Sequence, residues 1–304
     1  MTQIVVVGAN PAWQKVVRCE RLSPGEVVRA RRIQSGAAGK GFNCAQAIAS
    51  LGERVVLVSG VGEDAEAWRQ ACLDHRLEVF ELPLEGETRA ATTVIEVDGR
   101  VTEIVEEGPP ASARSQHVLE ERLAAHPVHQ PLAFCGTFPE GFDMAGIASC
   151  LEARTGLVVV DSIPLVRELL HRPVVCPGLV LKLNFAEWKS VVQHWTVDGL
   201  LAEVRHRLGE VGLVLTAGAD GAYAEDASGR RRQYPVARHP DLTQVHPIGA
   251  GDAFTAGMVV GHARGLGFLE ACAFGSVAAQ VSCRHPLPSR LARAEVDHLW
   301  AEVS

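Results

Sequence analysis

The sequence has no long hydrophobic run, no excess of basic residues and no closely spaced cysteine pair. No segment approaches the roughly 20 consecutive apolar residues of a membrane-spanning helix. The first residues, MTQIVVVGAN, also lack the basic region of a signal peptide. The 29 lysines and arginines are outnumbered by 36 aspartates and glutamates, and the resulting net charge of −7 disfavours nucleic acid as a partner. We therefore expect a cytoplasmic protein that binds neither membranes nor nucleic acids.

The eight cysteines are scattered along the chain, without any C-x-x-C pair. Several lie inside apolar stretches, such as LAFCGTF (132–138) and EACAFGS (270–276). We interpret them as buried free thiols in a reducing compartment, not as disulfides or metal ligands.

Short continuous apolar runs recur, and each ends in small or turn-forming residues, which is typical of strands covered on both faces. These runs lie at residues 4–10, 54–62, 132–141, 157–164, 179–184 and 212–221. Segments with helical spacing lie at 40–51, 63–75, 143–155, 198–208, 251–264 and 269–283. Strands that alternate with helices predict an α/β fold with a mostly parallel central sheet. Because no linker-like composition interrupts the chain, we expect one domain over residues 1–304.

Two further stretches, at about 12–34 and 87–107, alternate polar with apolar residues. Alternation indicates strands with one covered and one solvated face, and VDGR (97–100) is typical of a hairpin turn. We expect these ribbons to pair into a small antiparallel sheet that projects from the domain as a lid. The apolar face of such a sheet would be covered by the domain or by a second subunit, so a homodimer through the lid is expected.

The segment HPIGAGDAFTAGM (246–258) places one acid, Asp252, just before an apolar run of small residues. Gly249, Ala250 and Gly251 precede it, where a helix is expected to begin. A helix N-terminus attracts phosphate through its unpaired N–H groups and partial positive charge. An acid at that place is explained if it takes a proton from a hydroxyl that attacks the phosphate. On local physics alone, Asp252 is equally explained as a helix cap.

Three segments, in this order, resemble signatures of the ribokinase-like (PfkB) family of carbohydrate kinases: GAAGKGFNCAQAIASLG (36–52), LKLNFAEW (181–188) and GAGDAF (249–254). Four others resemble its subgroup of 1-phosphofructokinases and tagatose-6-phosphate kinases: NPAWQKVV (10–17), LSPGEVVRA (22–30), GETRAATTVI (86–95) and CGTFPEG (135–141). The resemblance implies a three-layer α/β/α fold with a small β-sheet lid. It also implies transfer of a phosphoryl group from ATP, with Mg²⁺, to a hydroxyl of a sugar phosphate.

The resemblance makes Asp252 the general base, with the backbone N–H groups of Gly249, Ala250 and Gly251 stabilising charge on the transferred group. In the family, the residues matching Asn184 and Glu187 help to place Mg²⁺, often through water, which suits an ion that keeps much of its hydration shell. The alternative for this pair is a helix-capping role.

For the nucleotide side of the site, the resemblance assigns Lys182, Asn184, Thr216, Gly218 and Gly221. Lys182 either approaches the phosphates or faces solvent. The segment TAGADG (216–221) either lies under the nucleotide or is an ordinary turn at a strand end.

On the sugar side, Gly39, Lys40 and Asn43 match positions that contact the substrate. Arg89 matches an arginine that holds the substrate's phosphate, a task that suits a planar, permanently charged group. Its alternative is a lid residue exposed to solvent.

The chain also departs from the subgroup at two sugar-reading positions. Gln14 stands where an aspartate usually grips a sugar hydroxyl, and Ala91 replaces an expected asparagine. Two other functions therefore stay open: a kinase of an unphosphorylated sugar or nucleoside, and a binding protein without turnover.

Overall fold

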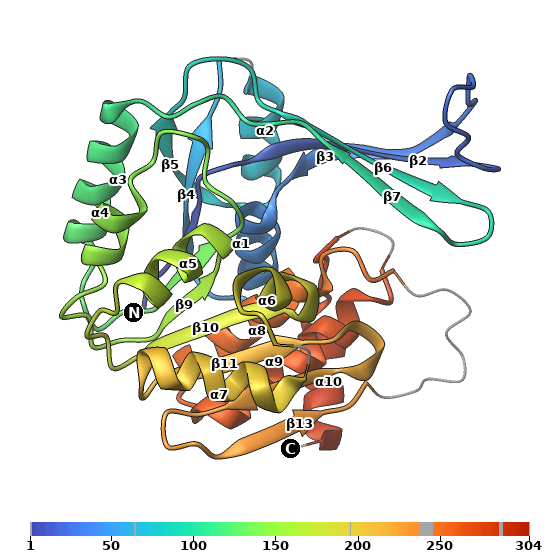
Figure 1. Ribbon diagram of the computed structural model, residues 1–304. Helices are drawn as coiled ribbons and strands as arrows, with labels where there is room; N and C mark the ends of the chain where they lie inside the picture. The colour runs from blue at the N-terminus through green and yellow to red at the C-terminus, as the bar shows by residue number, and fades with distance from the viewer. Residues whose placement is uncertain (1, 64, 195, 237–245, 286–287, 304) are drawn as a thin grey trace.

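The structure is a computed structural model that describes residues 2–63, 65–194, 196–236, 246–285 and 288–303 (Figure 1). In this part of the chain, nine strands form one large sheet. In sheet order they are β13 (Arg231–Tyr234), β12 (Ala222–Glu225), β11 (Gly212–Thr216), β10 (Leu179–Asn184), β9 (Val158–Asp161), β8 (Leu132–Cys135), β1 (Ile4–Gly8), β4 (Val55–Val61) and β5 (Glu78–Pro83). The seven strands from β11 to β5 pair in parallel, whereas β12 and β13 add an antiparallel edge. The predicted mostly parallel central sheet is confirmed.

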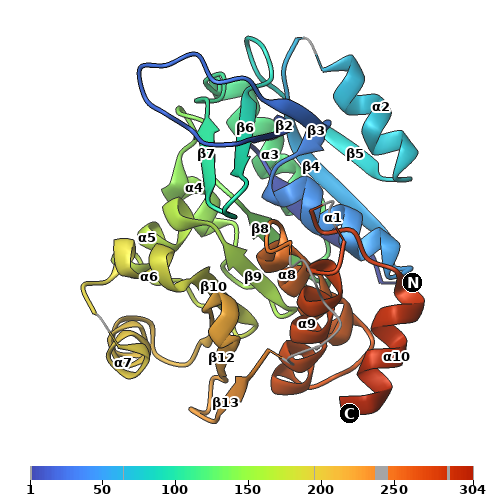
Figure 2. The same cartoon turned by 90° about the vertical axis from the view of Figure 1, so that its right-hand side faces the viewer.

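Helices cover both faces of this sheet, so the continuous apolar runs are buried on both sides (Figure 2). One face packs against α1 (Lys40–Ser50), α2 (Glu66–Asp74), α8 (Ala250–Ala263), α9 (Phe268–Ser282) and α10 (Arg293–Val303). The other packs against α3 (Ala113–Ala125), α4 (Met144–Ser149), α5 (Ile163–His171), α6 (Phe185–Val191) and α7 (Val197–Leu208). Strand β1 shows the division, since Ile4 and Val6 join the first core while Val5 and Val7 join the second. None of the helices in the described part has the length and apolar character needed to cross a bilayer.

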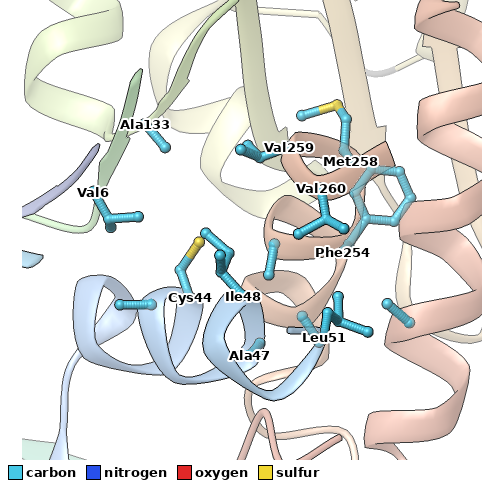
Figure 3. Close-up of a cluster of buried hydrophobic side chains, with 14 of the residues drawn as sticks. Val6, Cys44, Ala47, Ile48, Leu51, Ala133, Phe254, Met258, Val259 and Val260 are labelled. Atoms are coloured by element: carbon cyan, nitrogen blue, oxygen red, sulfur yellow. The ribbon is translucent and has the colours of Figure 1, made fainter. Parts of the chain in front are cut away.

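In the first core, helices α1 and α8 pack against each other (Figure 3). Cys44 and Ile48 of α1, and Leu51 directly after it, pack against Phe254 and Val260 of α8, and all five side chains are buried. Helix α8 is buried around nearly its whole circumference, which explains why its sequence is apolar and rich in small residues. The start of α8 is therefore held rigidly at the end of the sheet.

Helix α1 approaches strand β1 so closely that only glycine fits at the contact. A Cβ atom built on Gly41 would lie 2.4 Å from the Cα of Gly8. This approach brings the first turn of α1, with Lys40 and Asn43, to the carboxyl end of β1.

A second, four-stranded sheet projects away from the main body (Figure 1). Its strands, in order, are β3 (Arg31–Ala38), β2 (Ala12–Cys19), β6 (Ala90–Glu96) and β7 (Val101–Val105). Each ribbon is an antiparallel hairpin, and 97–100 forms the predicted turn of the second. The prediction that the two ribbons pair antiparallel is wrong, because β2 and β6 run in parallel. Both strands leave the main body in the same direction from adjacent starts, where Trp13 N donates to Arg89 O at 2.9 Å.

The six predicted strands and the six predicted helices of the large layers are all present, although residue 64, in the helix expected at 63–75, lies outside the described part. The eight cysteines are free as predicted; six are buried, while Cys150 and Cys283 are half-buried.

Candidate active site

A cleft with a cavity volume of about 300 Å³ is lined by the small sheet and by the carboxyl ends of the parallel strands. Ligands of open parallel sheets usually bind at this edge. The small sheet and its connections contribute Ala12, Gln14, Ala38, Arg89, Ala91, Glu103 and Val105 to the cleft wall. The main body contributes Gly39, Lys40, Asn43, Lys182, Asn184, Glu187, Thr216, Ile248, Gly249, Gly251 and Asp252. The cleft therefore brings together most of the residues that the sequence assigned to catalysis and binding.

The start of α8 forms the floor of the cleft at Asp252. Gly249 adopts a left-handed φ of +80° immediately before the helix, and a Cβ atom there would lie 2.7 Å from Ser289 N. Within the described residues, α8 has no side-chain cap; instead the Asp252 carboxylate accepts a 2.8 Å hydrogen bond from Asn43 Nδ2. The interpretation of Asp252 as a helix cap is therefore not supported. Of the three preceding amides, that of Ala250 already donates to Pro247 O at 3.1 Å.

The Asp252 carboxyl group is buried yet borders the cleft. Burial raises its pKa from an ordinary 3.8 to about 6, because the charged form loses its hydration. The positive charges of Lys40 and Lys182 oppose this rise, whereas the negative charge of Asp161 adds to it. A carboxylate with a pKa near neutrality, placed beside an open cleft, suits a general base.

Asp161, at the carboxyl end of β9, is completely buried and joins three parts of the site. Its Oδ1 accepts a hydrogen bond from Lys40 Nζ at 3.0 Å, and its Oδ2 accepts one from Lys182 Nζ at 2.6 Å. Thr255 of α8 donates to the same Oδ2 at 3.0 Å. Burial would raise the pKa of Asp161, but the two lysines outweigh this effect and hold the pKa at about 2. Asp161 is therefore an anion that fixes both lysines.

Each of the two lysines also has a second partner besides Asp161. Lys182 donates to Gly251 O at 3.0 Å, in the first turn of α8, and its side chain is only 3% exposed. The alternative that Lys182 faces solvent is thereby excluded. Lys40 also pairs with Glu187 Oε1 at 2.7 Å. Burial lowers the pKa of Lys40, but the charges of Asp161, Glu187 and Asp252 raise it by more.

Asn184 and Glu187 form a reciprocal cap at the start of α6. Asn184 Oδ1 accepts from Glu187 N at 2.9 Å, and Glu187 Oε2 accepts from Asn184 N at 2.8 Å. Both Glu187 oxygens are thus already hydrogen-bonded, and the described residues hold no cluster of three acidic, histidine or cysteine side chains for a metal ion. The pair fits Mg²⁺ only through bound water, because its oxygens border the cleft and retain second lone pairs.

On the sugar side, Gly39 and Asn43 lie at the start of α1, and Gln14 and Arg89 lie on the small sheet or beside it. Gln14 Nε2 donates to Thr93 Oγ1 at 3.0 Å. Arg89 is half-buried and donates to the backbone oxygens of Asn10, at 3.1 Å, and Pro11, at 3.2 Å. Burial lowers the pKa of Arg89. Arg89 is therefore fixed at the cleft by these two hydrogen bonds and is not a freely exposed lid residue.

On the nucleotide side, Thr216 ends β11 at the cleft, but the described residues that line the cleft do not include Gly218 or Gly221. These glycines belong to the short 3₁₀ turn η1 (Gly218–Asp220) and the residue after it. A Cβ atom on Gly221 would lie 2.0 Å from Tyr234 O, so this glycine is required by the neighbouring hairpin. The structure thus gives Gly221 a turn role, as in the alternative interpretation of this segment.

The sequence analysis missed Asp161, Thr255 and Glu103. Asp161 carried a usable signal, since it is the first polar residue after the buried run VVV, at the strand edge where sites form. Glu103 is one of several acids in a solvated ribbon, and Thr255 one polar residue in an apolar helix. Neither could be distinguished from the residues around it by spacing alone.

Comparison with known proteins agrees with this geometry. Residues 1–293 match the pfkB family of carbohydrate kinases. The chain is 30% identical to the 1-phosphofructokinase of Xanthomonas campestris pv. campestris over 291 residues, covering 89% of this chain and 87% of that protein. It is 27% identical to the 1-phosphofructokinase of Haemophilus influenzae over 287 residues, covering 91% and 89%.

Solved structures with the same fold include the phosphofructokinase-2 of Escherichia coli in complex with substrates and products. Its TM-score is 0.85 at 19% identity, over 99% of both chains. The ribokinase of Thermotoga maritima superposes with a TM-score of 0.77 at 18% identity, over 99% of this chain and 100% of that one. The expected three-layer, ribokinase-like fold is confirmed.

The two buried aspartates are expected to affect stability with opposite signs. Because the pKa of Asp252 is raised from 3.8 to about 6, its ionisation destabilises the folded state increasingly as the pH rises from 3.8 to about 6, and fully above that pH. Asp252→Asn should therefore stabilise the protein at pH 8 by about 1–3 kcal/mol, and the gain should shrink as the pH falls towards 4. The stabilisation from Asp161 is present above pH 3.8 and lost only towards about pH 2. Asp161→Asn should cost about 3–5 kcal/mol at pH 8, because it leaves two lysines without their buried counter-charge.

Urea denaturation at pH 8 and pH 4 measures both effects. Equal destabilisation by the two substitutions at pH 8 would contradict the assignment of the charges.

Proposed function

The chain belongs to the pfkB family of carbohydrate kinases, and we propose that it transfers the γ-phosphoryl group of ATP to a hydroxyl of a sugar phosphate. The observation that carries this proposal is the buried Asp252 carboxyl group, whose pKa lies near 6 where it borders the cleft. Among the described residues, no other carboxylate that lines the cleft is buried.

In the proposed reaction, the sugar hydroxyl lies against Asp252 and its oxygen attacks the γ-phosphorus of ATP. The new O–P bond forms as the bond to the β–γ bridging oxygen breaks, ADP leaves, and Asp252 accepts the hydroxyl proton. Asn43, which donates to Asp252 Oδ2, leaves the other carboxylate oxygen to take this proton. The hydrogen bond thereby orients the base.

Charge on the transferred group is stabilised by the N-terminus of α8. The amides of Gly249 and Gly251 are the donors best placed for this role, because Ala250 N already donates within the preceding turn. Such a donor is typically worth about 3 kcal/mol of transition-state stabilisation. Lys182 adds a fixed positive charge beside the same turn.

Asn184 and Glu187 would hold Mg²⁺ through water at the nucleotide side of the cleft. The ion would supply positive charge to the ATP phosphates. Lys182 and Thr216, on adjacent strand ends, would flank those phosphates.

Two features favour a substrate that already carries a phosphate. Arg89 borders the cleft on the side of the small sheet, whereas the residues assigned to ATP belong to the main body. Its guanidinium is oriented by two backbone oxygens, which pre-organises a group suited to phosphate. The two curated relatives reported above are also named 1-phosphofructokinases.

A kinase of a free sugar or nucleoside is the alternative within the enzymes, and a binding protein without turnover is the alternative outside them. Gln14 and Ala91, where the sugar-reading residues depart from the family pattern, leave both open. The ordered cluster of Asp252, Asn43, Lys182 and Asp161 favours turnover, because a protein that only binds has no need of a base with a raised pKa.

We also propose a homodimer that forms through the small sheet. Large apolar side chains are exposed along this sheet and its loops, outside the cleft-facing set of Val101, Glu103 and Val105: Val27, Ile33, Val97 and Ile104. Such an exposed set is typical of an interface. Oligomers are known for this fold, since the phosphofructokinase-2 of Escherichia coli has a tetrameric inhibited form. The eight free thiols agree with the reducing conditions of the cytoplasm, which we propose as the location.

The role of Asp252 predicts a specific kinetic result. Asp252→Asn should lower kcat by about 10²–10⁴, with both KM values nearly unchanged, because only proton acceptance is lost. For the wild type, kcat/KM should rise with pH through a midpoint of about 6, as the base loses its proton. Asp297→Asn, which alters a surface ion pair, is the control and should retain full activity. Full activity of Asp252→Asn would reject the mechanism.

The role of Arg89 predicts which substrates are affected by its loss. Arg89→Gln should raise KM for a sugar phosphate by about 10- to 100-fold, through loss of charged hydrogen bonds. The KM for ATP and for any unphosphorylated sugar should stay the same. Steady-state kinetics with fructose 1-phosphate, fructose 6-phosphate, tagatose 6-phosphate, fructose and ribose provides the test, with Arg100→Gln on the same ribbon as the control. If Arg89→Gln raised KM for free sugars by the same factor, the result would favour a kinase of an unphosphorylated sugar.

The dimer is tested by sedimentation at micromolar concentration. The wild type should sediment at twice the chain mass of 32.6 kDa. Ile104→Asp should give single chains, because it places a charge in the apolar patch; strand alternation turns this side chain away from the cleft-facing Glu103. A wild type of 32.6 kDa would rule out the dimer.

A further inference from the structure

The face of the small sheet that covers the cleft carries an acid to which the reaction described above gives no role. Strand alternation places Gln14, Ala91, Thr93, Glu103 and Val105 on this one face. Thr93 lies directly opposite Glu103 in the β6–β7 register, and Gln14 lies opposite Ala91 in the β2–β6 register. Four of these residues line the cleft, and Thr93, which is 1% exposed, lies buried beneath them.

A chain of two hydrogen bonds orients the polar groups on this face. Gln14 Nε2 donates to Thr93 Oγ1 at 3.0 Å, and Thr93 Oγ1 donates to Glu103 Oε1 at 3.2 Å. Because a hydroxyl has only one proton, its bond to Glu103 fixes the direction of the whole chain. Gln14 then presents its carbonyl oxygen, and Glu103 presents its second carboxylate oxygen, as acceptors. This wall of the cleft therefore offers two oriented acceptors to hydrogen-bond donors of a ligand.

Glu103 has no structural role that would account for its charge. Among the residues the structure describes, no lysine, arginine or histidine nitrogen lies within 4.0 Å of its carboxylate. It lies on β7, the outermost strand of the small sheet, and its side chain is exposed. A carboxylate brought into a closed, dry cleft needs a donor, since burial of an unpaired charge is costly. In the open cleft, water supplies that donor.

We propose that Glu103 reads the sugar, by accepting hydrogen bonds from hydroxyls that do not react, with Gln14 beside it as a second acceptor. This assignment rests on the proposed function, because it names the part of the substrate that contacts the small sheet. Glu103 repels phosphate, whereas Arg89 on the same side of the cleft attracts it. The two charges together orient a phosphosugar, with its hydroxyl-bearing ring against Glu103 and its phosphate against Arg89. Specificity for the sugar thus comes from the small sheet, and the chemistry comes from α8.

The test compares three variants of the full-length protein with the wild type. Glu103→Gln keeps the size of the side chain and removes the charge, and Thr93→Val removes the hydroxyl that orients Glu103 and Gln14. Glu107→Gln is the control, because Glu107 is an exposed acid of the same ribbon outside the cleft wall. Steady-state KM and kcat are measured for ATP, for the best phosphosugar of the panel above, and for its monodeoxy analogues.

Glu103→Gln should raise KM for the phosphosugar about 10- to 100-fold, the range expected for a charged hydrogen bond. Thr93→Val should raise it by a smaller factor, and Glu107→Gln should not change it. The KM for ATP should stay within twofold in all variants. Removal of one particular ring hydroxyl from the phosphosugar should raise KM at least tenfold for the wild type. For Glu103→Gln the same removal should raise KM by less than twofold, because the contact with that hydroxyl is already lost.

Two results would overturn the assignment. One is a Glu103→Gln variant whose KM for the phosphosugar equals that of the wild type. The other is a rise in KM that is the same in the wild type and in Glu103→Gln for every deoxy analogue. Failure of the proposed function looks different, since the wild type itself would then turn over no phosphosugar. In that case, calorimetric titration of the same sugars into wild type and Glu103→Gln decides the assignment, and equal affinities reject it.

Discussion

The interaction of Asp161 with Lys40 and Lys182 joins the segments that build the cleft. Asp161 ends strand β9, Lys182 comes from the neighbouring strand β10, and Lys40 begins helix α1. Lys182 also donates a hydrogen bond to the carbonyl oxygen of Gly251, so it connects the start of α8 to Asp161. A buried ion cluster of this kind is costly to form and strongly disfavours any arrangement that leaves one member unpaired. The position of Asp252 follows from it.

The electrostatics of the cleft follow from the same cluster. Burial raises the pKa of Asp252 and the negative charge of Asp161 adds to this rise, whereas the positive charges of Lys40 and Lys182 oppose it. These opposing effects leave Asp252 able to exchange a proton near neutrality. The floor of the cleft is consequently charged and rigid, whereas its other wall is a small sheet with exposed apolar side chains.

Much of the fold could be predicted from the sequence, because the central strands are continuous apolar runs and their helices keep a regular spacing. Strand β5 was not predicted because its sequence, EVFELP, is neither a continuous apolar run nor a regular alternation, as its place at the sheet edge allows. Within the site, two of the three family signatures predicted Asp252 and Asn43 but not the hydrogen bond between them, since 209 positions separate the two residues. The parallel pairing of β2 with β6 depends on the direction in which each strand leaves the main body, which local alternation does not encode.

The short link between β1 and β2 has a consequence for how this protein can diversify. Three residues, Ala9, Asn10 and Pro11, connect β1 of the large sheet to β2 of the small sheet, and in the part of the chain that the structure describes no strand belongs to both sheets. None of Asp161, Lys40 and Lys182 belongs to the small sheet, so a substitution in that sheet changes the cleft wall without removing a member of the buried ion cluster. Gln14 and Ala91, where the chain departs from the family pattern, both lie in the small sheet, outside this cluster.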